Sequence, residues 1–326
     1  MSSTVIIADL GPEKAGAFVK VFTAVLNSPV ATRTFAQIID GLPVADTYDY
    51  SSTLRWDIRS RLEPSQNSTI QFRDMRSAIQ IENIPIDAMV NYYNHTFPPY
   101  ISSRPDIDYF QTAQAYQMVP LRSSAFNMHL LEIVAVAVHD LASRLYTMLH
   151  PNGEIPEDIP PDDSFPPLPT ATPSSFYVYP YYLWQSYPRG VSDMVGYWAE
   201  KQIFGGVVLF DRGPNDDKNC HGAYIHYERE NIFQLTDTQL QRFTRSATDT
   251  QGLHEDSGAP GLEIPLFPEP GTRIVTMFDS FSLNIYRDKY ERVQPIRDTK
   301  PRCVFKREDD PERFAFMDEV IKRNSS

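Results

Sequence analysis

The sequence predicts an α+β fold, with a helical N-terminal region and a mixed, partly antiparallel β C-terminal region. Apolar residues recur at three- and four-residue steps in residues 1–150, which is typical of amphipathic helices. Residues 151–175 then hold eight prolines and no Lys or Arg, a composition that favours an acidic Pro-rich loop or linker. In residues 176–326 short β-prone runs alternate with helical segments, so we expect a mixed α+β region there.

Helices account for most of the predicted N-terminal region. Pro12 suits a first helical position, and apolar residues mark one face over residues 12–27. The same kind of spacing, together with stops at Gly and Pro, predicts further helices at 31–40, around 52–62, and from Ile86 to the break at Pro98.

The clearest predicted helix begins near Ser124, a candidate N-cap, and ends near Leu149. It is apolar nearly all round from Leu130 to Val138, so we expect it to be the central helix of a helical layer. Three histidines lie near whole-turn spacings along it, at His129, His139 and His150. We interpret them as a helix end and two polar-face positions rather than as metal ligands.

Strands and short helices are expected to alternate in the C-terminal region. Two glycines lead into Val207–Phe210, which reads as a short buried strand. Ser192 is a candidate cap for the helix before it, and Thr236 or Asp237 for a helix after it. The other predicted elements are strands in FYVYPYYLW (176–184, broken at Pro180), GAYIHYE (222–228), NIFQL (231–235), LEIPLF (262–267) and TRIVTMF (272–278), and a last helix in PERFAFMDEVIKR (311–323).

Composition indicates the class of protein and the cellular compartment that we expect. The chain has 326 residues and a net charge of −12, without a basic cluster, which argues against contact with nucleic acid or with anionic membranes. The N-terminus lacks a basic segment and a long apolar core, and the longest apolar run, Ile133–Val138, is far shorter than a membrane span. Two cysteines make no disulfide framework. We expect a soluble cytoplasmic protein that contacts neither nucleic acid nor membrane.

The strongest candidate for a reactive pair is His226 with Glu228. Residues two apart on a strand share a face, so both side chains would point to the same side. We interpret them as a metal-free proton-transfer pair, with no cofactor predicted. The alternative is a non-haem iron site, in which His254 would be the distal ligand and Arg273 would bind an oxo-acid cosubstrate.

Aromatic side chains are dense between residues 176 and 198, where nine occur within 23 residues. Aromatic rings with polar tips can line a pocket for a flat organic ligand, although they also build ordinary cores. The candidate substrate-binding residues are Tyr179, Tyr182, Trp184, Tyr197 and Trp198.

Two further motifs have plainer interpretations beside the functional ones. Cys220 precedes His221, but adjacent residues in an extended chain point apart, so a buried structural cysteine is the preferred interpretation. The string PPLP at Pro166–Pro169 resembles a ligand for a proline-motif-binding protein, although such strings are also common in plain linkers.

Two segments of the chain resemble one group of proteins from filamentous ascomycetes. The residues VSDMVGYWAEKQIFGGVVLFDRG (191–213) are similar to the DMVGYWAE…GGVVLFDR core of that group, and IYRDKYER (285–292) to its IYRD-(W/Y)-ER segment. The resemblance covers under a tenth of the chain. The group has no assigned activity, so no catalytic residue carries over, but some members lie in clusters for specialised metabolism.

Three hypotheses of function follow from the sequence. The first is a small-molecule-handling protein of fungal specialised (secondary) metabolism and, if it is an enzyme, a metal-free cyclase, isomerase or dehydratase acting on a small organic ligand. The second is a non-catalytic interaction or regulatory protein that uses the Pro-rich loop and an aromatic groove. The third is a non-haem iron oxygenase.

Overall fold

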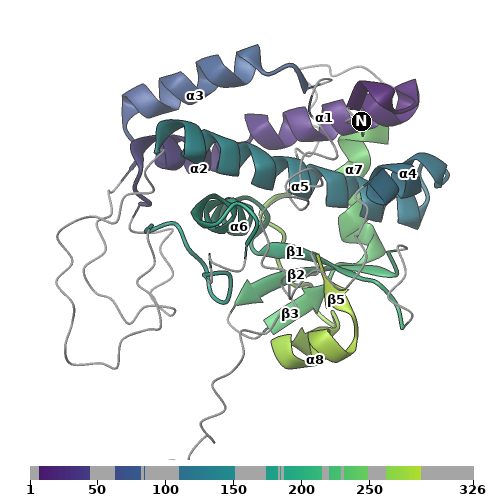
Figure 1. The fold of residues 1–326 in the computed structure, drawn as a ribbon. Coiled ribbons are helices and arrows are strands. Elements are labelled where there is room, and N and C mark those ends of the chain that lie inside the picture. The colour runs from purple at the N-terminus through teal and green to yellow at the C-terminus, as the bar shows by residue number, and fades with distance from the viewer. Residues whose placement is uncertain are drawn as a thin grey trace, which may run out of the picture. The chain divides into compact units, whose positions relative to one another are not determined.

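Eight α-helices and a five-stranded antiparallel sheet are found among the described residues of the computed structural model (Figure 1). Those residues are 7–44, 63–81, 84, 110–150, 174–182, 184, 187–214, 220–228, 231–248 and 262–287. All of them belong to the first of two compact units, residues 1–292. The predicted α+β class is confirmed, with a helical N-terminal region and a sheet in the C-terminal region.

The first helices follow the sequence pattern closely. After a short 3-10 turn, η1 (Ile7–Asp9), helix α1 spans Pro12–Asn27 as predicted. Helix α2 spans Pro29–Asp40, and it starts two residues earlier than predicted because the Ser28 side chain accepts a hydrogen bond from the Ala31 amide. Helices α3 (Gln66–Ala78) and α4 (Phe110–Met118) are additional. The helices predicted around 52–62 and from Ile86 lie outside the described residues.

Helix α5, Ser124–Leu149, is the central helix of the N-terminal region, as predicted. It packs against α1, α2, α4, α6 and α7. Its cap is Ser123 rather than Ser124, because Ser123 Oγ accepts a hydrogen bond from the Phe126 amide. By length and composition α5 passes for a membrane span, as does the bent pair α1–α2, but 83% of the most apolar window of α5 is buried within the protein. Such burial is that of a core helix.

Three helices lie in the C-terminal region: α6 (Val191–Phe204), α7 (Asp237–Thr248) and α8 (Met277–Ser282). Ser192 does not cap α6, because Gly190 occupies the cap position and the Ser192 hydroxyl donates to the Arg189 carbonyl instead. Helix α7 begins with a capping box. The Thr236 hydroxyl accepts from the Gln239 amide, and the Gln239 side chain accepts from the Thr236 amide.

The sheet has the order β4-β3-β2-β1-β5, and each pair is antiparallel. Its strands are β1 (Val207–Asp211), β2 (Gly222–Glu228), β3 (Asn231–Gln234), β4 (Ile274–Thr276) and β5 (Ile285–Tyr286). The register pairs Val207 with His226, and His226 in turn with Ile232. Strands β1, β2 and β3 are those that the sequence predicts.

Two strand predictions are wrong. The described part of 176–184 contains no strand: residues 179–182 form turns, and Pro180 has no amide hydrogen for a ladder. Residues 262–267 also contain no strand, although the Leu266 amide donates to the Phe204 carbonyl. The 272–278 run divides into β4 and α8, because the Thr276 side chain accepts from the Asp279 amide and starts a helix.

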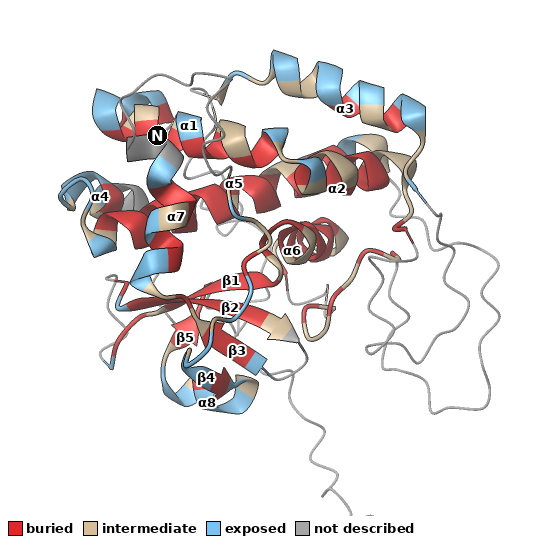
Figure 2. Cartoon of the chain, turned by 180° about the vertical axis from the view of Figure 1, so that it is seen from behind, coloured by how far each residue is buried: buried red, intermediate tan, exposed pale blue. Residues whose placement is uncertain are grey.

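Strand β1 is buried on both faces from Val207 to Phe210 (Figure 2). Val208 and Phe210 join the large apolar core formed with the helices, whereas Val207 and Leu209 face a second cluster rich in tyrosine. Helix α6 contributes to both clusters, with Trp198 in the first and Tyr197 in the second. Because α5 packs on α6, the predicted regions 1–150 and 176–326 share one core within residues 1–292.

Candidate functional site

His139 of α5 is held by one face of α6. The His139 Nδ1 atom lies 2.7 Å from Glu200 Oε1, and Nε2 lies 3.2 Å from Asp193 Oδ1. Both carboxylates lie on the same face because residues seven apart are separated by about two helical turns. Between them Gly196 leaves room for the imidazole, since a Cβ atom there would lie 2.6 Å from two ring atoms. The spacing of Asp193, Gly196 and Glu200 thus matches one bound ring.

Two arginines complete this group, which we call the His139 network (His139, Asp193, Glu200, Arg189 and Arg287). Arg287, directly after β5, donates to Glu200 Oε1, and its Nη2 lies 2.9 Å from His139 Nδ1. Arg189 donates to Asp193 from its Nε atom at 2.7 Å and from its backbone amide at 2.8 Å. The network therefore joins α5, α6 and the end of β5.

Asp193 keeps its negative charge in this buried place. Burial alone would raise the pKa of Asp193, but the hydrogen bond from His139 and the charge of Arg189 lower it to about 2. Arg189 also pairs with Asp140, which accepts from Arg144 at 2.5 Å. The charges of the network thus extend from the core to the exposed Arg144.

A second buried group lies farther toward the N-terminus of α5, and we call it the His129 cluster (His129, Glu132, Cys220 and Arg212). His129 Nδ1 is 3.1 Å from Glu132 Oε2, and Cys220 Sγ is 3.4 Å from the same oxygen. Arg212, at the exit of β1, donates to Glu132 Oε1 at 2.6 Å. The Arg212 guanidinium also lies over the rings of Phe210 and Tyr286.

Burial and charge set the protonation states in the His129 cluster. Burial would raise the pKa of Glu132, but the charge of Arg212 and the hydrogen bond from His129 bring it down to about 2. Burial, and then the negative charge of Glu132, raise the pKa of Cys220 well above its usual range. Cys220 is therefore a buried thiol at neutral pH, while His221 beside it is exposed.

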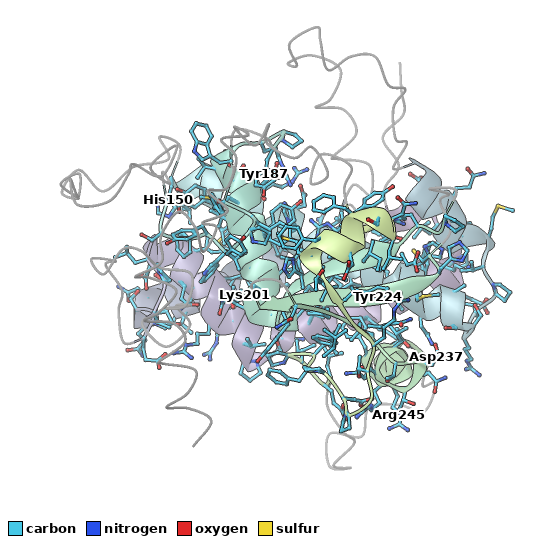
Figure 3. All side chains as sticks on the ribbon, turned by 90° about the horizontal axis from the view of Figure 1, so that it is seen from below. His150, Tyr187, Lys201, Tyr224, Asp237 and Arg245 are labelled. Atoms are coloured by element: carbon cyan, nitrogen blue, oxygen red, sulfur yellow. The ribbon has the colours of Figure 1, made fainter. Side chains whose placement is uncertain are left out.

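His226 has a tyrosine partner. Its Nδ1 lies 3.0 Å from the Tyr181 hydroxyl, and its ring meets the Tyr181 ring edge to face. Tyr181 stacks on Tyr197, with ring centroids 4.6 Å apart, and Tyr197 in turn meets the ring of His139 at 4.5 Å. These ring contacts connect His226 to the His139 network. Figure 3 labels Tyr187 and Tyr224, which belong to the same tyrosine-rich cluster as Tyr181 and Tyr197.

The predicted partner of His226 was Glu228, whose side chain lies outside what the structure describes. The β2–β3 register shifts between these two residues, so simple alternation does not hold there. His254, the distal ligand of the iron alternative, lies outside the described residues as well. Arg273, the residue expected to bind the cosubstrate in that alternative, has its Nη1 atom 3.3 Å from the Tyr224 hydroxyl. The acid–base pair and the iron site both stay predictions.

The predicted substrate-binding aromatics divide between two places. Tyr197 is fully buried beside Tyr181, but Trp198 points into the large core and meets Phe176 edge to face. Tyr182 and Trp184 are half-buried and pack against the tyrosine-rich cluster, and the half-buried Tyr179 stacks on Tyr182.

The histidines of α5 correct one expectation and show what the sequence pattern concealed. His129 and His139 are buried rather than on a polar face, because partners from α6 and from the β1–β2 connection cover that side of α5. Glu132 stands three residues after His129, so the helix itself indicates this pair. No local pattern indicated that Arg212 and Arg287 would meet the buried acids.

The fold and these contacts define an α+β protein with two buried His–carboxylate–Arg groups and a tyrosine-bound histidine. No protein-family model, curated protein or solved structure matches the chain. The function proposed below is therefore argued from the residues of this chain.

Proposed function

We propose that this chain binds and transforms a small organic compound of fungal specialised metabolism, with His226 as the proton-transfer group and Tyr181 as its partner. The observation that supports the proposal is the 3.0 Å contact between the Tyr181 hydroxyl and His226 Nδ1 within a cluster of tyrosines. The resemblance of residues 191–213 and 285–292 to ascomycete proteins supplies the biological setting.

The chemistry follows from the side chains. Histidine changes protonation near neutral pH, so one imidazole can remove a proton from a substrate and return it. The Tyr181 hydroxyl orients the His226 ring through Nδ1. Glu228, two residues along β2, remains a proposed second group. Isomerisation needs only this exchange: one C–H bond breaks, a C–H bond forms at another carbon, and no net electron is transferred.

We propose that the ligand binds against aromatic side chains of the tyrosine-rich cluster that contains Tyr181. Tyr179, Tyr182 and Trp184 keep part of their surface exposed, whereas Tyr181 and Tyr197 are buried. Aromatic rings with polar tips suit flat organic compounds that carry hydroxyl or carbonyl groups. We therefore propose an unsaturated or aromatic substrate.

Comparative metabolite profiling tests the proposal. A strain that lacks the gene is complemented with the wild-type gene or with a variant, and extracts are compared by mass spectrometry. A general acid–base residue contributes about 10²–10⁴-fold to rate. We expect His226→Gln and Tyr181→Phe to deplete one product at least about tenfold and to accumulate its precursor.

His221→Gln is the matched control, because His221 is an exposed histidine next to the same strand. It should give the wild-type profile. Tyr181→Phe keeps the stacked ring and removes only the hydroxyl, so it separates loss of chemistry from loss of folding. An unchanged profile in the strain without the gene, or full product with a folded His226→Gln protein, overturns the proposal.

A further inference from the structure

We propose that His129, Glu132 and Cys220 bind one thiophilic divalent metal ion, zinc in the first place. These side chains approach one another from two elements that are far apart in sequence, and all three are buried. The site is separate from the Tyr181–His226 pair and does not depend on the function proposed for it.

The distances between the three donor atoms are those of a zinc site. They are 3.1 Å for His129 Nδ1 to Glu132 Oε2, 3.4 Å for Cys220 Sγ to Glu132 Oε2, and 3.7 Å for Cys220 Sγ to His129 Nδ1. Tetrahedral zinc holds sulfur at about 2.3 Å and nitrogen or oxygen at about 2.0–2.1 Å, so its donor atoms lie about 3.3–3.6 Å apart. The triangle therefore fits three corners of a tetrahedron to within a few tenths of an ångström.

The backbone explains why the donors converge. His129 and Glu132 are three residues apart on α5, so their side chains lie on the same face of the helix. Cys220 stands two residues before β2, at the end of the connection that brings the chain back to pair with β1. An ion at this point would tie the central helix to the sheet.

Arg212 holds the carboxylate in a way that suits a ligand. It donates to Glu132 Oε1, whereas Glu132 Oε2 faces His129 and Cys220. One oxygen is thus anchored by a neighbouring cation and the other is directed at the proposed ion, which is the usual arrangement around a metal-bound carboxylate. A thiolate and a carboxylate would also offset the two charges of the ion, beside the Arg212 guanidinium, whose Nη1 atom lies 3.5 Å from Cys220 Sγ.

The donor types select the metal. Sulfur and imidazole favour zinc and related transition metals, whereas magnesium and calcium prefer sets made of oxygen alone. Without a metal, the Cys220 thiol and the His129 N–H can both donate to Glu132 Oε2. A bound metal displaces the thiol proton and takes the Nδ1 lone pair, so the proton of the neutral imidazole then lies on Nε2 and metal uptake should release the thiol proton.

Cobalt(II) titration of the full chain, purified and stripped with a chelator, tests the proposal. We expect one equivalent of Co(II) to bind and to produce a thiolate-to-cobalt charge-transfer band in the near ultraviolet. Zinc should abolish the band by displacement and should raise the unfolding temperature of the chain. Cys220→Ser should remove the band, and His129→Gln should weaken cobalt binding at least about tenfold.

Cys303→Ser is the matched control, since Cys303 is the second of the two cysteines in the chain. It should leave the band and the stoichiometry unchanged. Absence of the band from folded wild-type protein at excess Co(II) overturns the site whatever the variants do. A band that survives Cys220→Ser, or disappears with Cys303→Ser, overturns it too. Circular dichroism identifies any variant that fails to fold.

Discussion

The identity of some single residues in this protein is explained by the side-chain rings that they contact. Gly196 is the plainest example, because its missing Cβ makes room for the buried His139 imidazole between Asp193 and Glu200. A glycine inside a helix lowers stability relative to alanine unless something occupies the space. Here the His139 imidazole occupies the space that a side chain at position 196 would need, so packing requires glycine there.

Gly196→Ala should therefore destabilise the protein, by about 1–3 kcal/mol as expected for an overpacked core. Gly16, in the middle of α1, is the control because a Cβ added there would meet no neighbouring atom within 4 Å. Gly16→Ala should raise the free energy of unfolding by about 0.5–1 kcal/mol. Chemical denaturation measures both. Equal effects of the same sign would contradict the assignment of Gly196.

Secondary-structure elements are predictable here where periodicity and caps agree. The helices at 12–27 and 124–149 and strands β1 to β3 have clear patterns and are confirmed. Helix α3 is not evident from the sequence because it buries only Ser68 and Phe72. The aromatic run 176–184 favours strands by composition, but its rings pack into two clusters from a turn.

The N-cap of α5 is identified by the hydrogen bonds of two neighbouring serines, Ser123 and Ser124. Ser123→Ala should lower the free energy of unfolding by about 1 kcal/mol, because Ser123 accepts from the Phe126 amide at the start of α5. The neighbouring Ser124 is exposed and donates to Asp237 instead. Ser124→Ala should therefore change stability by less than about 0.5 kcal/mol. The reverse order in urea unfolding would show that Ser124 is the cap.

The candidate site illustrates the limit of sequence patterns. His226 was identified from its strand, but its partner in space, Tyr181, lies 45 residues away on a segment of turns. Arg287 and Glu200 are likewise separated by 87 residues. Such pairs depend on the packing of α6 against the sheet, which no local spacing encodes.

At the scale of the whole molecule, buried charges join the helical and sheet regions. His139 comes from the central helix, Glu200 from α6, and Arg287 from the end of the last described strand. Breaking a buried pair leaves an uncompensated charge and is strongly destabilising, whereas an exposed pair contributes little. The His139 network should therefore act on the stability of the entire compact unit, residues 1–292.

Acid should weaken this network through Asp193. Its pKa is about 2 in the folded chain against an ordinary 3.8, so its contribution is complete above about pH 5 and is lost as pH falls toward 2. The shift corresponds to about 2 kcal/mol. We expect the stability advantage of wild type over Asp193→Asn to shrink by about that amount between pH 5 and pH 2. An advantage independent of pH in this range would contradict the ionised, paired state of Asp193.

A double-mutant cycle on Glu200 and Arg287 tests most directly whether buried charges join the two regions. It uses Glu200→Gln and Arg287→Met, with chemical denaturation of each single and double variant. The comparison cycle is Glu63→Gln with Arg33→Met, an ion pair at 3.1 Å whose Glu63 side chain is 70% exposed.

We predict a coupling of about 2 kcal/mol or more for Glu200 with Arg287, and under about 1 kcal/mol for the exposed pair. Each single substitution in the buried pair should also lower the free energy of unfolding by about 3–5 kcal/mol. Couplings of equal size in the two cycles would contradict the claim that buried charges join the helical and sheet regions.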